Sequence, residues 1–199
     1  MFRARYAVVT MPAIPSDAPC GLVLAAGAGR RFGGPKALAR TAAGTPWVAL
    51  AARALREGGC SEVLVTLGAS ADEAVPLLPG GVTVVRVPDW QTGVAASVRA
   101  GLEAAACGPA PAVVILPVDT PDATSSAVAR LARRAARGSL AYATYDDAPG
   151  HPVLIGRDHW SAVAASVRGD VGARPYLVAA GADAVECGDL WSGVDRDER

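Results

Sequence analysis

The sequence has no excess of either charge, only four cysteines, no asparagine and no long hydrophobic run. The 19 basic residues balance the 19 acidic ones, whereas a broad nucleic-acid-binding face needs many clustered cations. No apolar stretch reaches the length of about 18 residues that a membrane-spanning helix requires. The hydrophobic fraction of 51% and the charged fraction of 19% exclude a disordered chain. These absences predict a globular protein that binds neither nucleic acid nor membrane.

Cysteine is too sparse to build a disulfide scaffold. The four cysteines are far apart, and none forms a C-x-x-C pair, which argues against a zinc site. They are typical of buried thiols in a cytoplasmic protein. Residues 1–18 contain Pro12 and Pro15 and no signal-peptide pattern, so we expect a flexible N-terminal extension there. The length of the remainder predicts a single domain over residues 19–199.

Short apolar runs alternate with helical periodicity along the chain. The periodicities predict a three-layer, Rossmann-like α/β fold, in which helices cover both faces of an open, mostly parallel sheet. Such sheets bind their ligands at the carboxyl ends of the strands. The expected strands are 20–25, 62–67, 82–87, 112–118, 140–145, 152–156 and 184–187. The expected helices begin at Pro46 and at Gly93, or span 71–78, 123–137, 158–167 and 172–180.

The loop after the first expected strand is rich in glycine and basic residues. Phe32 stands where a dinucleotide-binding fingerprint needs glycine, and Pro35-Lys36-Ala37 does not match a P-loop. What remains is a cradle of small residues with Arg30, Arg31 and Lys36, suited to phosphate. Lys36 is the one lysine in a chain that otherwise uses arginine, and a compact ammonium contacts phosphate as a point charge. The loop therefore predicts a nucleotide-phosphate site.

A second candidate follows the most apolar strand. Asp119 is delivered to the carboxyl end of 112–118, where one carboxylate together with phosphate oxygens suits Mg²⁺. An aspartate before proline is also a common turn or helix-capping residue. Asp122 fits the capping role better, because it directly precedes the helix expected over 123–137. We therefore take Asp119 as a metal ligand.

Residues 24–38, LAAGAGRRFGGPKAL, resemble the signature loop of the nucleotidyltransferase superfamily. The resemblance runs over residues 20–198 and is strongest to molybdenum cofactor cytidylyltransferases and other MobA-like NTP transferases. It implies a fold of the nucleotide-diphospho-sugar transferase type. It also implies a catalytic role for Lys36, Arg30 and Asp119. The residues that it implies to bind the nucleotide in this loop are Leu24, Ala25, Ala26, Gly27, Gly29, Arg30 and Lys36.

Three further segments carry the resemblance. In 88–97 it implies that Gly93 and Ser97 contact the nucleotide, although Val87 stands where the family has asparagine. Gly150-His151-Pro152-Val153-Leu154 and residues 169–174, GDVGAR, match family segments near the acceptor, which implies acceptor contacts for His151 and Arg174 and a second magnesium carboxylate from Asp170. Asp195 resembles a terminal family motif that the chain leaves at Arg196 and Asp197.

Each of these segments has a structural alternative. Trp90 and His151 could serve packing alone, and Asp170 could cap the helix expected from 172. The row of basic residues Arg130, Arg133, Arg134 and Arg137 is predicted to be a solvated helix face.

The reaction implied by the resemblance is Mg²⁺-dependent transfer of CMP from CTP to a phosphate-bearing acceptor, molybdopterin, with release of pyrophosphate. The Ala25-Ala26-Gly27 sequence favours CTP over GTP. Two alternatives stay open: a guanylyl or sugar-phosphate nucleotidyltransferase, and a non-catalytic molybdenum cofactor binding protein. The expected partners are these small molecules and, beyond them, a molybdoenzyme or accessory protein.

Overall fold

The computed structural model describes residues 17–197, so the extension expected over 1–18 lies almost entirely outside the described residues. Within them the chain forms one seven-stranded sheet in the order β3-β2-β1-β4-β6-β5-β7. All neighbouring strands are parallel except in the two pairings made by β6. The strands are β1 (Cys20–Leu24), β2 (Val63–Leu67), β3 (Thr83–Arg86), β4 (Ala112–Pro117), β5 (Leu140–Tyr145), β6 (Ala148–Gly156) and β7 (Asp183–Glu186). The predicted mostly parallel α/β sheet is confirmed.

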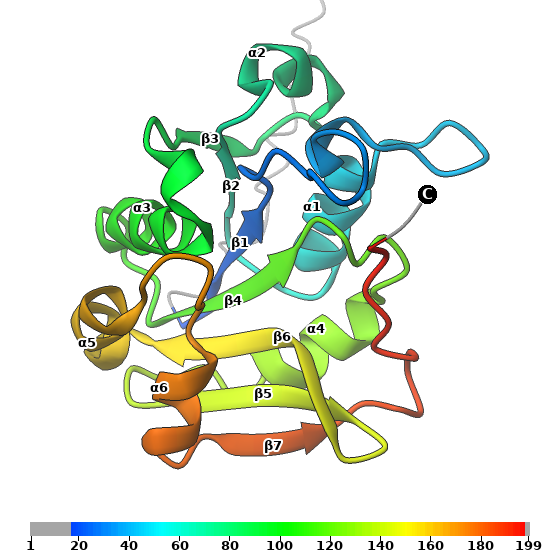
Figure 1. Ribbon diagram of the computed structural model, residues 1–199. Coiled ribbons are helices and arrows are strands. Elements are labelled where there is room, and N and C mark those ends of the chain that lie inside the picture. Colours follow the sequence, from blue (N-terminus) through cyan, green and yellow to red (C-terminus); the bar gives the residue numbers. More distant parts are fainter. Residues whose placement is uncertain (1–16, 198–199) are drawn as a thin grey trace, which may run out of the picture.

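Helices cover both faces of the sheet, as Figure 1 shows. Helices α1 (Trp47–Glu57) and α4 (Ser125–Ala132) pack on one face, and α3 (Val94–Ala106), α5 (Trp160–Ser166) and α6 (Arg174–Ala179) pack on the other. The short α2 (Ala71–Ala74) lies between β2 and β3 in the chain. Four 3₁₀ turns complete the described elements: η1 (Lys36–Leu38), η2 (Val75–Leu77), η3 (Trp90–Thr92) and η4 (Arg157–His159). The three predicted layers are thus present.

Helix α3 lies unusually close to β1 because it carries a glycine at the contact. A Cβ atom on Gly101 would lie 2.4 Å from the Leu22 side chain, which is fully buried. This close approach packs α3 directly on β1 and β2, with its N-cap at Gly93.

Several predicted helix boundaries were wrong, and the local hydrogen bonds explain them. Pro46 is the N-cap of α1 rather than its first helical residue. Helix α4 is shorter than 123–137 because Thr124, not Asp122, caps it: the Thr124 hydroxyl accepts a hydrogen bond from the Ala127 amide at 3.2 Å. Past Ala132 the chain continues as tighter turns that are closed by the Ser139 hydroxyl donating to the Arg134 carbonyl.

The region around β6 also differs from the expectation. Strand β6 begins at Ala148 instead of 152, because Asp146 and Asp147 form a tight hairpin turn with positive φ angles of 50° and 65°. Such a turn matches the right-handed twist of the two strands that it joins. Strand β6 therefore runs back antiparallel between β4 and β5 and carries Gly150 and His151 toward the carboxyl ends of its neighbours.

Of the basic row that was predicted to be a solvated helix face, Arg133, Arg134 and Arg137 are exposed as expected, but they lie beyond the end of α4, and Arg130 within it is partly buried. Arg130 forms two hydrogen bonds with the Asp189 carboxylate, at 2.6 and 2.8 Å, and donates to the Glu186 carbonyl. Arg134 and Arg137 pair with Asp183 and Asp158. The contacts of Arg130 hold the end of β7 and the segment after it against α4. The prediction that the cysteines are buried thiols was wrong at one position, since Cys107 is exposed.

The sheet order places a natural ligand site between β1 and β4. The chain continues from β1 to β2 on one side and reaches β4 on the other, so the strand order reverses there and the loops after β1 and β4 diverge. Over residues 17–197 no helix is long and apolar enough to cross a membrane.

Candidate active site

A cavity of about 1100 Å³ opens at the carboxyl ends of β1 and β4. Its walls come from the loop after β1, the N-terminal half of α3, the loop after β4, β6, α6 and the C-terminal segment. Every residue that the sequence singled out as catalytic, nucleotide-binding, acceptor-binding or metal-binding lines this cavity: Leu24, Ala25, Ala26, Gly27, Gly29, Arg30, Lys36, Gly93, Ser97, Asp119, His151, Asp170 and Arg174.

The glycine-rich loop is closed by its own backbone. The Gly29 carbonyl accepts hydrogen bonds from the amides of Gly33 and Gly34, at 3.0 and 3.1 Å. Gly29 has φ +57°, and a Cβ there would lie 2.0 Å from the Gly34 carbonyl oxygen, so no other residue fits. Phe32 is buried under this turn and packs on Trp47, with ring centroids 5.1 Å apart. The loop thus has a hydrophobic anchor, while Arg30 is exposed on the cavity wall.

Lys36 joins the two sides of the cavity. Its Nζ donates to Asp119 Oδ2 at 2.9 Å and to Asp197 Oδ1 at 2.8 Å, and its side chain is only 14% exposed. Desolvation lowers the pKa of Lys36, but the hydrogen bonds to Asp197 and Asp119 outweigh it and hold the pKa above its ordinary value. Lys36 is therefore a fixed positive charge between the loops after β1 and β4.

Asp119 has an oxygen free for a further ligand. Its Oδ1 is buried and makes no hydrogen bond within residues 17–197, and a buried unpaired carboxylate oxygen is costly unless something else binds it. Asp195 lies exposed at the cavity edge nearby, where crowding by protein atoms and the charges of Asp119 and Asp197 raise its pKa to about 6. The arrangement suits a divalent cation.

The described residues do not form a complete metal cage. Within 17–197 no group of three or more His, Cys, Asp or Glu side chains is arranged around one point. Mg²⁺ is held in many nucleotide sites by one or two carboxylates, with the remaining positions taken by phosphate oxygens and water. The donor set of Asp119 and Asp195 fits that pattern.

The loop 169–172 docks against the N-terminus of α3. Gly93 has φ +108°, and a Cβ there would lie 2.3 Å from the Gly169 carbonyl oxygen and 2.7 Å from Asp170 Oδ1. Asp170 is exposed to the cavity, and it does not cap a helix, because the residue before α6 is Ala173. Ser97 faces the cavity from α3 although it is 4% exposed.

Two residues of the 87–97 segment have mainly packing roles. Val87, which replaces the family asparagine, is buried against Ala26 and Ala96, so this position has no polar side chain to offer. Trp90 is partly buried against the same cluster and also lines the cavity. Trp90 therefore packs against this cluster and also forms part of the cavity wall.

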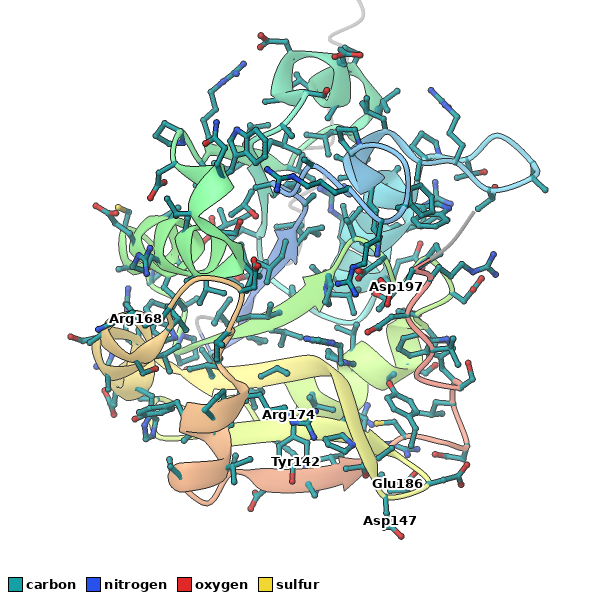
Figure 2. All side chains as sticks on the ribbon, viewed as in Figure 1. Tyr142, Asp147, Arg168, Arg174, Glu186 and Asp197 are labelled. Atoms are coloured by element: carbon teal, nitrogen blue, oxygen red, sulfur yellow. The ribbon has the colours of Figure 1, made fainter. Side chains whose placement is uncertain are left out.

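The far end of the cavity combines a neutral imidazole with an unpaired cation. Burial, followed by the charge of Arg174, lowers the pKa of His151 to about 4 despite the nearby Asp119, so the ring is neutral at pH 7. The His151 carbonyl accepts a hydrogen bond from the Tyr145 hydroxyl, which fixes this part of β6. The Arg174 side chain makes no hydrogen bond or ion pair with any residue from 17 to 197, and it lines the cavity. Arg174 is the first residue of α6 and is labelled in Figure 2.

Sequence reasoning missed parts of the cavity that come from the C-terminal segment and from β5. Asp197 binds Lys36, and Arg196 donates through its amide to the Asp119 carbonyl at 2.8 Å and through its side chain to Asp122. These residues are where the chain leaves the family pattern, so the resemblance gave no signal for them. Tyr142 also lines the cavity, and its position on a half-buried strand was the only signal available.

Comparisons with known proteins agree with this geometry. A family model described as the MobA-like NTP transferase domain matches residues 21–184. The nicotine blue oxidoreductase of Paenarthrobacter nicotinovorans is 38% identical over 201 residues, which covers 92% of this chain and 94% of that protein.

Solved structures share the fold across nearly the whole chain. Rv0371c from Mycobacterium tuberculosis H37Rv has a TM-score of 0.74 and 27% identity, covering 91% of this chain and 94% of that one. Another structure of Rv0371c is a complex with manganese, with a TM-score of 0.65 and 23% identity, covering 85% of this chain and 89% of that one. A nucleotidyl transferase from Methanothermobacter has a TM-score of 0.78 and 20% identity, covering 91% of this chain and 92% of that one.

Proposed function

The chain belongs to the MobA-like NTP transferase family, and on this premise we propose that it transfers CMP from CTP to a phosphate-bearing acceptor, with molybdopterin as the acceptor. The observation that carries the proposal is the pairing of Lys36 with Asp119 across the two loops, with Asp119 Oδ1 left free. A cation for the triphosphate and a carboxylate for a metal thus meet where the ligand of such a sheet binds.

The reaction needs no protein nucleophile. A phosphate oxygen of the acceptor attacks the α-phosphorus of CTP, the bond to the bridging oxygen of the β-phosphate breaks, and pyrophosphate leaves. Such transfers are catalysed by positioning and by stabilising charge. Lys36 and Arg30 hold the negative charge of the triphosphate, and the carbonyl contact of Arg196 fixes the position of Asp119. Asp119, with either Asp195 or Asp170 as a second carboxylate, would hold Mg²⁺.

When bound, Mg²⁺ supplies charge neutralisation and orientation for the phosphate oxygens. The manganese complex of Rv0371c supports a divalent ion in this fold.

The nucleoside lies against the first loop in this proposal. Leu24, Ala25, Ala26, Gly27 and Gly29 allow the backbone to approach it, and Gly93 and Ser97 contact it from α3. The second alanine of the loop favours cytosine. A preference for GTP, or for a sugar phosphate as acceptor, is the closest alternative, since it requires the same phosphate machinery.

The test is pyrophosphate release from CTP, GTP, ATP and UTP with Mg²⁺ or Mn²⁺ and molybdopterin. We expect release with CTP, and we expect Lys36→Ala to lower it by at least 100-fold. Arg53→Ala is the matched control, because Arg53 is an exposed arginine on α1 outside the cavity. Release with GTP alone would replace the cytidylyl assignment by a guanylyl one. Binding of CTP without release would favour a non-catalytic cofactor-binding protein.

The 38% identity to nicotine blue oxidoreductase favours a second candidate function, an oxidoreductase activity. The first loop argues against a dinucleotide in the usual binding mode, because buried Phe32 replaces the glycine of the fingerprint. Oxidation of NADH or NADPH in the presence of nicotine blue tests this candidate. Oxidation that survives Lys36→Ala, without pyrophosphate release from any nucleotide, would establish it.

A further inference from the structure

The last described residues, 191–197, reach the cavity without forming a helix or a strand. We propose that Tyr145 is a positioning residue, whose buried ring seats segment 191–197 so that Asp197 meets Lys36 and Asp195 lies at the cavity edge. The inference rests on the proposed function for the roles of Lys36 and Asp195. It deepens that function by naming the residue that sets their relative positions.

Tyr145, the last residue of β5, is where segment 191–197 is anchored. Trp191 packs edge-on against its ring, with the ring centroids 5.2 Å apart and the ring planes at 79°. Two glycines also approach this ring: a Cβ on Gly193 would overlap Tyr145 Cδ2, and a Cβ on Gly150 would lie 3.0 Å from it. Gly193 has φ +73°, a conformation that favours glycine. The C-terminal segment and β6 therefore both pack directly on the Tyr145 ring.

Beyond Gly193 the segment reaches the two loops that carry Lys36 and Asp119. The Arg196 amide donates to the Asp119 carbonyl at 2.8 Å, and Asp197 accepts a hydrogen bond from Lys36 Nζ at 2.8 Å. In Figure 1 the segment is the red ribbon that passes α4 on its way to the loop after β4. Asp195 directly precedes these contacts and lines the cavity. The path of the segment thus decides where this carboxylate lies relative to Asp119.

The contacts at the far end are too exposed to hold the segment by themselves. Asp197 is 64% exposed, and both partners of the Arg196 ion pair are 51% exposed. Exposed ion pairs contribute little to stability, whereas each residue of an irregular segment loses conformational entropy when it is fixed. The buried packing of Trp191 and Gly193 on the Tyr145 ring supplies the missing anchor, since aromatic pairs gain from buried area and from edge-to-face geometry.

The test uses Lys36, the one lysine of the chain, as the reporter. Its side chain is 14% exposed and hydrogen-bonded to Asp119 and Asp197, so an amine-acylating reagent should modify it slowly. The rate is measured on the full chain, without nucleotide or metal, by mass spectrometry of the peptide that contains Lys36. Tyr145→Leu should raise the rate about fivefold or more. Tyr145→Phe, which keeps the ring, should stay within about twofold of wild type.

A pair of glycine variants tests the same contact from the other side. Gly193→Ala should also raise the rate about fivefold or more, because its methyl group would overlap the Tyr145 ring. Gly181→Ala is the matched control: Gly181 has φ +68°, and a Cβ there meets nothing within 4 Å, so the variant has the backbone strain without the overlap. Asp197→Asn gives the rate for Lys36 without this contact, and adding Tyr145→Leu to it should change the rate by less than about twofold, because both changes act through one contact.

Modification of buried thiols separates release of the segment from unfolding. Cys20 and Cys60 are buried, and a variant that is merely destabilised would expose Lys36 and these thiols together. Release of the segment should raise the rate at Lys36 alone. Should Tyr145→Leu expose the thiols as well, Gly193→Ala decides. An unchanged rate at Lys36 in both variants, or a parallel rise at Lys36 and the thiols in both, would overturn the inference.

The outcome is distinguishable from that of the proposed function, because the readout needs neither nucleotide nor metal. Faster modification of Lys36 in the variants, together with a wild type that releases no pyrophosphate, would support the positioning role of Tyr145 and refute the transferase proposal. Pyrophosphate release by wild type, together with an unchanged rate at Lys36 in the variants, would refute the positioning role alone.

Discussion

Replacing Asp197 by asparagine should strengthen triphosphate binding in the absence of metal. The Asp197 carboxylate occupies one of the three donors of Lys36, at 2.8 Å, and Asp119 occupies a second. A triphosphate oxygen that approaches the third donor meets the charge of Asp197 at about 4 Å, and two unit charges at that distance interact by about 1 kcal/mol in water. Asp197 is 64% exposed, so the water value applies. We expect CTP to bind about fivefold more tightly.

The folding free energy should change far less than the affinity. An exposed ion pair contributes less than about 1 kcal/mol to stability, so the thermal midpoint of Asp197→Asn without ligand should stay within about 3 °C of wild type. Calorimetric titration of CTP in EDTA measures the affinity. The matched control is Asp72→Asn, because Asp72 forms an exposed pair with Arg86 outside the cavity. The gain should shrink in 0.5 M salt. Weaker binding of CTP to Asp197→Asn would refute the reasoning, since Asp197 would then help to hold the nucleotide.

Two further predictions concern stability. Gly101→Ala should lower the thermal midpoint by as much as about 4–8 °C, because overpacking against Leu22 costs up to about 3 kcal/mol and the gain in helix propensity returns only about 1 kcal/mol of it. Gly138→Ala, where a Cβ meets nothing within 4 Å, is the control in the same melting experiment. The folded-state pKa of His151, about 4, lies below its unfolded value of about 6.5, so wild type should lose up to about 3 kcal/mol as the pH falls from 6.5 to 4. The raised pKa of Asp195 has the opposite effect on stability between pH 6.5 and 4. The free energy of unfolding of wild type is therefore compared with that of His151→Gln by urea titration at each pH. Parallel pH profiles of the two proteins would contradict the assignment to His151.

The fold was predictable because its elements carry strong local signals. Buried parallel strands such as β4 are continuous apolar runs, and the alternation of strands with helices fixes the layered architecture. The antiparallel β6 was not predictable in its full length, because its hairpin with β5 depends on two consecutive aspartates with positive φ, an uncommon turn sequence. The length of α4 was equally hidden, since Thr124 and Asp122 are both capping residue types and only the folded backbone selects one.

The candidate site likewise has one part that the sequence predicted and one part that it did not. The residues at the strand ends, such as Lys36 and Asp119, stood out because topology brings strand ends together whatever the side-chain details. Arg196 and Asp197 of the C-terminal segment did not stand out as site residues, because their side-chain partners are more than 70 positions away in the chain. No periodicity or spacing encodes that kind of contact.

The chain departs from the family pattern at Arg196 and Asp197. Both residues contact the site, Arg196 through the Asp119 carbonyl and Asp197 through Lys36, and they add their charges to it. Arg196 is neutralised by Asp122, which leaves Lys36 facing the carboxylates of Asp119, Asp195 and Asp197. Lys36 is one cation among these three carboxylates, so its immediate surroundings carry a net negative charge that attracts a divalent ion. The nucleotide should therefore bind as its metal complex, so the affinity for CTP should rise steeply with Mg²⁺ or Mn²⁺. Titration of CTP at increasing metal concentration measures this coupling, and an affinity that does not depend on metal would show that the carboxylates do not share a cation with the nucleotide.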